Sequence, residues 1–424
     1  MTIAVRSDSS GSPSARSATK PRRMLMIGYN TVDEAVAKGI IRRDDEASLE
    51  LYYNFGQMFD EVLYIVPFGR ADLNQRLTDT IEYREVQFTR THRGARLALA
   101  GLTHVPKTVR FINEVVRQFQ PDVVQVCGPH IPAALTLLSK EAWRLPSVCF
   151  IEAFWETILP QQQNLPSLIR KVLPNWYRLV VYRRFDRYTG APSLSPDFYS
   201  RLGMDRSKIS CWIQPLDLRQ LVNASVTDAP PEVLSAPQPR VVVVGRLHPE
   251  KLAGDALEIF ARAVSPGHAG TLIFIGDGTE RAAIEARARE LGLEKRIVVT
   301  GLLPHSGALA AMKACDYSIA PMQGSALLES LGAGLATVAY DHETHRALID
   351  NGRTGVLVPH RDIAAAAAVL ERWLASPSAA KSIGQAAQHQ VFDRFSVPNV
   401  KEILRAAFDE AFEGRRVSKI KRAV

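Results

Sequence analysis

Short apolar runs that end in Gly, Pro or Asn alternate with longer amphipathic stretches through the first part of the chain. Residues 108–119 place Val109, Ile112, Val115, Val116 and Phe119 on one helical face, which predicts a crossover helix. Runs that are apolar throughout are typical of parallel strands buried on both faces. The strands predicted here are Met24–Ile27, Glu61–Ile65, Asp122–Val126 and Ser147–Ile151.

The same alternation returns in the second part of the chain. The predicted strands are Val241–Val244, Thr271–Ile275, Arg296–Thr300, Tyr317–Ala320, Thr337–Ala339 and Gly355–Val358. The predicted helices include Thr279–Leu291, His305–Ala314, Asp362–Leu374 and, last, Val397–Phe412. This pattern indicates an α/β fold with two Rossmann-like, doubly wound domains. Two such domains facing each other form a cleft bounded by the carboxyl ends of both sheets, where open α/β sheets bind ligands.

A length of 424 residues also favours two domains over one core. The stretch rich in Pro and Ala before Val241 lacks periodicity and predicts a linker. The expected segments are a disordered basic tail 1–23, an N-terminal domain 24–216, a linker 217–239, a C-terminal domain 240–395, a helix 396–413 that packs back on the first domain, and a basic tail 414–424.

The formal net charge of +8 belongs to the tails, because five basic residues against Asp8 stand in residues 1–23 and five more in residues 414–424. The body between them is therefore close to neutral, and a dedicated nucleic-acid binder is not expected. The four cysteines form no CxxC pair, which indicates neither a zinc site nor a disulfide scaffold. The sequence shows no secretory leader and no run long enough to span a membrane, so we expect a cytoplasmic or peripheral protein.

The run VVVVGRLHPEK places Arg246 and Lys251 directly after a predicted strand, on the loop that opens a helix. Two cations beside a helix N-terminus suit a diphosphate, because Arg supplies a planar fork, Lys a point charge and the helix its free amides. An ordinary solvated loop is the alternative.

Three further segments follow predicted strands of the second part. In IFIGDGTER, Gly276 and Gly278 predict a turn that approaches a ligand or only reverses the chain; the full dinucleotide fingerprint is absent, so an NAD enzyme is set aside. The loop Gly301, Leu302 and Leu303 offers backbone groups to a nucleobase.

The third segment, PMQGSALLESLGAGLATVAY, holds one charged residue, Glu329, and that carboxylate requires donors. The amides of Gly324 and Ser325 suit a phosphate, and ribose hydroxyls would satisfy Glu329. A helix-surface glutamate is the alternative.

In their order and spacing, these segments resemble the group 1 glycosyltransferases, a retaining family with the GT-B fold that includes glycogen synthases. The resemblance is strongest over Val241–Val358. It implies that Arg246 and Lys251 hold the diphosphate, that Gly301–Leu303 accepts the base and that Glu329, the second glutamate of an E-x7-E motif, holds the ribose.

The chain departs from the family pattern at three positions. The first glutamate of E-x7-E falls on Pro321, and the usual glycine after Lys251 is Leu252. In the first domain Glu152 stands near the place where relatives carry a His that contacts the sugar. Glu152 is thus a candidate catalytic residue, with a rim glutamate as the alternative.

Other candidates of the first domain are less specific. Glu156 neighbours Glu152 on the acceptor side, and His130, in VCGPHIP, follows a predicted strand. Gly39 is a candidate for a glycine loop near the donor phosphates. The segment Ile169–Arg187 combines basic residues with Trp176, Tyr177 and Tyr182, which suits an anionic membrane surface or, alternatively, a helix packed on the first domain.

The predicted function is transfer of a hexosyl group, with retention, from a nucleotide sugar to a hydroxyl acceptor that is a saccharide or is linked to a lipid, as in polysaccharide biosynthesis. No metal and no cofactor are expected. The alternatives are an epimerase or phosphorylase on the same fold, or a non-catalytic nucleotide-sugar-binding partner of another transferase.

Overall fold

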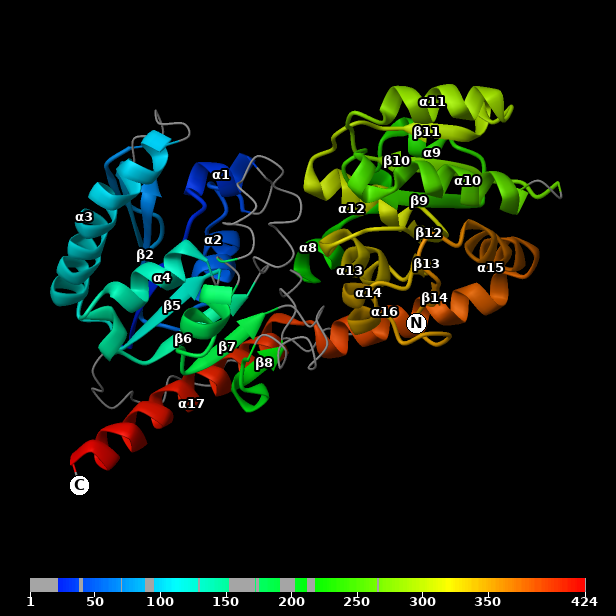
Figure 1. The fold of residues 1–424 in the computed structure, drawn as a ribbon. Coiled ribbons are helices and arrows are strands. Elements are labelled where there is room, and N and C mark those ends of the chain that lie inside the picture. The colour runs from blue at the N-terminus through cyan, green and yellow to red at the C-terminus, as the bar shows by residue number, and fades with distance from the viewer. Residues whose placement is uncertain are drawn as a thin grey trace. The chain divides into compact units, whose positions relative to one another are not determined.

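The computed structural model describes residues 22–37, 41–69, 71–87, 95–128, 130–151, 172, 175–190, 203–211, 218–264 and 267–423 (Figure 1). They form two sheets of mainly parallel strands, and helices connect most successive strands along the chain. By proximity the chain divides into two compact units, residues 1–127 with 134–147, and residues 128–133 with 148–424. The domain boundaries at 216 and 240 stay a prediction, whereas the α/β, doubly wound fold class is confirmed.

The first sheet has eight strands in the order β3-β4-β2-β1-β5-β6-β7-β8. Its strands are β1 (Arg23–Ile27), β2 (Glu61–Gly69), β3 (Leu73–Arg76), β4 (Ile81–Gln87), β5 (Val123–Cys127), β6 (Ser147–Ile151), β7 (Arg187–Gly190) and β8 (Ile209–Cys211). Its main helices are α1 (Val32–Ala37), α2 (Glu46–Asn54), α3 (Ala95–Phe119) and α4 (Ile131–Leu138). β3 runs antiparallel to its neighbour β4.

The second sheet has six parallel strands in the order β11-β10-β9-β12-β13-β14. These are β9 (Arg240–Val244), β10 (Thr271–Ile275), β11 (Ile297–Val299), β12 (Tyr317–Ala320), β13 (Ala336–Tyr340) and β14 (Val356–Val358). Counted along the chain this is the order 3-2-1-4-5-6 of a Rossmann fold. The order reverses between β9 and β12.

Helices cover both faces of this sheet, so its strands are apolar on both sides. Val241 and Val243 point into one core cluster and Val242 into the other, as strand geometry requires. The helices are α10 (Ala253–Val264), α11 (Arg281–Glu290), α12 (His305–Lys313), α13 (Ser325–Gly332), α14 (Glu343–Leu348), α15 (Ile363–Ala375) and α16 (Pro377–Arg394).

The predicted linker contains two short helices, α8 (Leu218–Asn223) and α9 (Pro231–Leu234). Lys313 donates from Nζ to the carbonyl oxygens of Leu221, Val222 and Ala224, where α8 ends. Arg240 donates to the carbonyl oxygens of Leu234, Ala236 and Ala314. Lys313 of α12 and Arg240 of β9 therefore fix the described part of this segment, from Leu218, to the second sheet and its helices. Both cations donate hydrogen bonds to main-chain carbonyl oxygens of the segment.

The last helix, α17 (Val397–Ala423), extends well beyond the end predicted at Phe412. It contacts β7 and β8, and Arg415 donates from Nε to Oδ2 of Asp186 at 2.8 Å. Arg187 and Glu410 form a second ion pair along the same contact.

Of the three aromatic residues that would suit a membrane surface, two are buried. Tyr177 and Tyr182 are 4% and 1% exposed, because their rings pack in the core. Trp176 and Leu179 do face solvent. Within the described residues, no helix has the length and apolar character that crossing a bilayer requires.

Candidate functional site

The loops after β9 and β12 leave the second sheet at its point of reversal. Open α/β sheets bind ligands in the crevice outside these strand ends. Arg246 and Lys251 follow β9, and Gly324, Ser325 and Glu329 follow β12. The topology thus brings together two predicted groups of residues that lie about eighty positions apart in the sequence.

Arg246 and Lys251 place two positive charges on one short loop. The Arg246 side chain is 64% exposed and pairs with Glu250 at 3.3 Å. Burial, and then the charge of Arg246, lower the pKa of Lys251 below its ordinary value of 10.5, while Glu250 opposes the shift. Because each cation raises the free energy of the other, a multiply charged anion bound between them would relieve the repulsion.

The turn Gly276–Gly278 holds this cationic loop in place. The Leu247 amide donates to the carbonyl oxygen of Asp277, and the Glu280 amide donates to that of Leu247, both at 2.9 Å. A Cβ atom on Gly276 would lie 2.0 Å from the Gly245 oxygen, and one on Gly278 would lie 2.3 Å from the Leu247 oxygen. The two glycines therefore permit contact between two loops of the protein, and the donor-binding role of Gly278 stays a prediction.

Leu252 adopts a backbone conformation that suits glycine. It ends the 3-10 turn Pro249–Lys251 with φ 54° and ψ 38°, in the left-handed region. For a leucine this costs about 1 kcal/mol. The local geometry explains why the resemblance predicts glycine here, and Leu252 retains that geometry.

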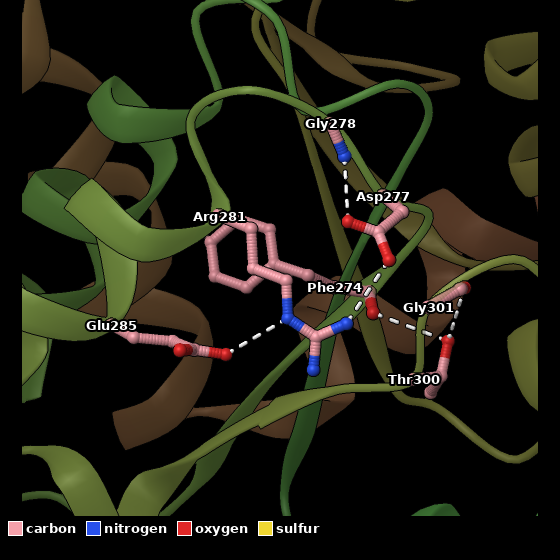
Figure 2. A network of polar contacts seen from close by, with 7 residues as sticks. All are labelled: Phe274, Asp277, Gly278, Arg281, Glu285, Thr300 and Gly301. Carbon is pink, nitrogen blue, oxygen red and sulfur yellow. Dashed lines mark hydrogen bonds and ion pairs between the residues drawn. The ribbon is translucent and has the colours of Figure 1, made fainter.

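Beside the Gly301 loop lies a network of ion pairs (Figure 2). Arg281 donates from Nη1 to Asp277 Oδ2 at 3.1 Å and from Nε to Glu285 Oε1 at 3.0 Å. Gly301, with φ 72°, accepts a hydrogen bond from the Gly276 amide at 3.0 Å. Leu302 is 79% exposed, so it offers an apolar surface to a flat ring, while Leu303 packs partly against the core.

Glu329 lies on α13, and its side chain is 13% exposed. The sequence predicted that this carboxylate needs a donor, and the protein supplies one: His305 Nε2 lies 2.9 Å from Oε1. The other ring nitrogen of His305, Nδ1, lies 2.9 Å from Gln220 Oε1. His305 was missed from the sequence, although it follows the Gly301 loop as the first residue of α12.

Gly324 and Ser325 are exposed at the N-terminus of α13, where no side chain of the described residues caps the helix. The preceding loop is held by His345, which is 1% exposed and lies 3.0 Å from the Gln323 carbonyl oxygen and 2.8 Å from that of Tyr340. Burial is the largest effect on His345 and lowers its pKa. Amides at an exposed helix start suit an anion, so the phosphate-binding role of Gly324 and Ser325 stays a prediction.

In the first sheet the order also reverses, between β1 and β5. His130 follows β5, and burial lowers its pKa from 6.5 to about 4, so the ring is neutral at neutral pH. A Cβ atom on Gly28, after β1, would lie 2.3 Å from the Tyr64 hydroxyl. The candidates Gly39, Glu152 and Glu156 lie outside the described residues.

A cavity of about 610 Å³ lies elsewhere in the first sheet. It is lined by Glu61 and Val62 at the start of β2 and by Ile81 and Glu82 at the start of β4. These are the amino ends of parallel strands, so the cavity is at the edge opposite to the one where such sheets bind ligands.

Residues 227–390 match the family described as glycosyl transferases group 1. This range contains Arg246, Lys251, Gly301 and Glu329. Residues 227–390 belong to the group 1 glycosyltransferases.

Two relatives of this segment are named as glycosyltransferases. The 2-deoxystreptamine glucosyltransferase of Streptomyces kanamyceticus is 27% identical over 182 residues, which are 42% of this chain and 47% of that protein. The GDP-mannose-dependent alpha-mannosyltransferase of Mycobacterium tuberculosis is 26% identical over 281 residues, 64% of this chain and 69% of that protein. The match to the glucosyltransferase thus spans about half of that relative's length.

The fold of the whole chain is also that of solved structures. HepE of Anabaena, solved in complex with UDP and glucose, superposes with a TM-score of 0.63 at 15% identity, over 92% of this chain and 99% of HepE. The match extends well beyond residues 227–390. The fold predicted for the whole chain, GT-B, is therefore confirmed.

Proposed function

We propose that this chain is a retaining glycosyltransferase that moves a hexosyl group from a nucleotide-diphosphate sugar to a hydroxyl acceptor. The observation that carries the proposal is the convergence of Arg246, Lys251 and Glu329 at the reversal point of the second sheet. The mannosyltransferase relative is named for a GDP-sugar donor, and HepE was solved with UDP, which supports a donor of this class.

These residues bind different parts of the donor. Arg246 and Lys251 bind the diphosphate and stabilise its charge as it departs, together with the exposed amides at Gly324 and Ser325. Leu302 faces the nucleobase, and Glu329 accepts hydrogen bonds from the ribose hydroxyls. Positioning and charge stabilisation carry the catalysis, and the two cations take the part that a metal ion plays in other transferases.

The acceptor binds at the first sheet, with His130, Glu152 and Glu156 as the candidate contacts. The exposed side chains Trp176 and Leu179, close in sequence to Arg183 and Arg184, support an acceptor linked to a lipid at an anionic membrane surface. Membrane contact of this kind would be peripheral.

The test starts with the donor. Thermal unfolding is measured with UDP-, GDP-, ADP- and TDP-sugars on the wild type, Glu329→Ala and Arg246→Ala. We expect one nucleotide class to raise the unfolding temperature of the wild type and to raise it less in both variants. If no nucleotide sugar stabilises the wild type, the proposed function is wrong.

The second stage identifies the reaction with that donor. Transfer to saccharide and lipid-linked acceptors, with the anomeric configuration of the product read by NMR, tests for a retaining transferase. The absence of the first motif glutamate, at Pro321, favours one rival, a nucleotide-sugar-binding partner without activity. Donor binding without turnover over many acceptors would support that rival, and a changed sugar without an acceptor would indicate an epimerase.

A further inference from the structure

Three side chains form a chain of hydrogen bonds that ends at Glu329. Gln220 of α8, His305 of α12 and Glu329 of α13 are joined by two contacts of 2.9 Å through the two nitrogens of the His305 ring. Helix α8 also packs on both α12 and α13. The His305 ring is therefore held at both ends.

The chemistry of the three groups fixes the direction of the hydrogen bond to Glu329. An ionised carboxylate only accepts hydrogen bonds, so Nε2 of His305 must carry a proton and donate a hydrogen bond to Oε1 of Glu329. Gln220 fits a neutral and a charged imidazole alike, because its amide can present either its oxygen or its NH₂ group to Nδ1. The orientation of the ring thus does not depend on its charge.

The burial of Glu329 limits the number of groups that can reach its carboxylate. Its side chain is 13% exposed against 41% for His305, so the carboxylate presents only a small part of its surface to solvent. His305 occupies Oε1, which leaves Oε2 to accept from an external donor. A vicinal diol binds a carboxylate in a defined plane only if the carboxylate cannot rotate, and His305 prevents that rotation.

We propose that His305 is a positioning residue that orients Glu329 toward the ribose diol and so sets the preference for ribonucleotides over 2′-deoxyribonucleotides. The inference rests on the proposed function, because it requires Glu329 to face the ribose. Gln220 supports His305 from the other side of the ring.

Calorimetric titration with UDP, GDP and ADP and with their 2′-deoxy counterparts tests this role. The proteins are the full-length wild type, His305→Ala, His305→Gln, Glu329→Ala and His389→Ala, a matched control on the exposed surface of α16. We expect the wild type to prefer the ribonucleotide roughly tenfold, the effect of one hydrogen bond to a charged group.

The expected results separate positioning from a general structural role. His305→Ala should reduce the preference to about twofold while the 2′-deoxynucleotide binds as before, because the lost hydrogen bond serves the diol alone. His305→Gln, whose amide NH₂ reaches a position similar to that of Nε2, should restore most of the preference. His389→Ala should match the wild type.

Three results for His305→Ala would overturn the inference alone. The variant could lose affinity for ribonucleotides and 2′-deoxyribonucleotides equally, or it could keep the wild-type preference for ribonucleotides. It could also bind ribonucleotides more tightly than the wild type, which would mean that His305 competes with the ribose. A wild type that binds none of these nucleotides would overturn the inference; if no nucleotide sugar of the thermal-unfolding panel, TDP-sugars included, stabilises it either, the proposed function is wrong as well. If Glu329→Ala keeps the wild-type preference for ribonucleotides, another residue binds the ribose, and the inference is overturned too.

Discussion

Arg361 donates two hydrogen bonds to Asp255, from Nε to Oδ2 at 3.2 Å and from Nη2 to Oδ1 at 3.0 Å. Asp255 is 7% exposed and also accepts from the Tyr340 hydroxyl at 3.0 Å. Its amide donates to the Leu252 carbonyl oxygen. The pair therefore anchors the first turn of α10 directly behind the loop that carries Lys251.

Arg361→Ala should destabilise the protein measurably, because Asp255 stays buried and loses its cationic partner. The cost is moderate because Asp255 keeps its bond to Tyr340 and because the Arg361 side chain is 59% exposed, which screens the ion pair. Urea unfolding measures the change. Arg353→Ala is the control, since its pair with Asp350 is exposed on both sides and should cost under about 0.5 kcal/mol. Equal effects of the two variants would contradict the anchoring role.

Arg246→Ala should lower kcat about a hundredfold, the typical loss on removing one fixed transition-state donor. Its charge is exposed and acts on the leaving diphosphate, so the unfolding temperature should stay within a degree or two of the wild type. Steady-state kinetics with the donor found by thermal shift measure the effect. Full activity in this variant would exclude Arg246 from catalysis.

Donor affinity should fall as the pH rises, beginning below 10.5, because burial and Arg246 lower the pKa of Lys251 in the free protein. The protonated amine attracts the diphosphate, so binding above that lowered pKa must take up a proton. Lys251→Arg should remove this pH dependence. The unfolded chain holds the proton more tightly, so Lys251→Met should stabilise the unliganded protein while weakening donor binding. A flat pH profile in the wild type would contradict the role of Lys251.

Acid should destabilise the protein through His130. Its pKa is about 4 in the folded state and 6.5 ordinarily, so the unfolded chain binds the additional proton as the pH falls through this interval. Stability is unaffected above 6.5 and falls below it, by at most about 3 kcal/mol from this residue. His130→Gln should flatten the profile between pH 6.5 and 4. The buried His345 contributes in the same direction and will remain in that variant.

Gly276→Ala should destabilise the protein by about 3 kcal/mol or more, because the new Cβ atom would meet the Gly245 oxygen and the residue has φ 141°. The cationic loop would move with it, so donor binding should weaken as well. Gly414→Ala, on α17 with open space around it, is the control and should be neutral or stabilising. A neutral Gly276→Ala would mean that the two loops separate easily.

The apolar strands could be predicted from the sequence because each is buried on both faces. Ser147–Ile151, Thr271–Ile275 and Tyr317–Ala320 are observed with the predicted bounds. Ile81–Gln87 was missed because polar residues alternate with buried ones along it. Pro377–Arg394 was missed as well, since its buried face is built mainly from alanine, glycine and glutamine, which give a weak helical pattern.

Arg246 and Lys251 could be placed from the sequence because they closely follow a predicted strand, and Glu329 because it is the one charge of an apolar segment; their roles in binding stay predictions. His305 could not be paired with Glu329, because the two residues lie 24 positions apart and their contact depends on the register of two helices. Tyr177 and Tyr182 show the opposite failure: they suggested a surface, and side-chain direction buried both.

The contact of α17 with β7 and β8 bears on how the chain is made. Asp186 and Arg415 lie 229 positions apart, and β8 is an edge strand of its sheet. While the chain is being synthesised, this edge emerges from the ribosome long before the helix that packs on it. An edge strand without its packing helix can pair with another chain, so the nascent protein is exposed to aggregation until α17 has been synthesised. A stop codon before Val397 would remove α17 and leave the β8 edge permanently without this helix.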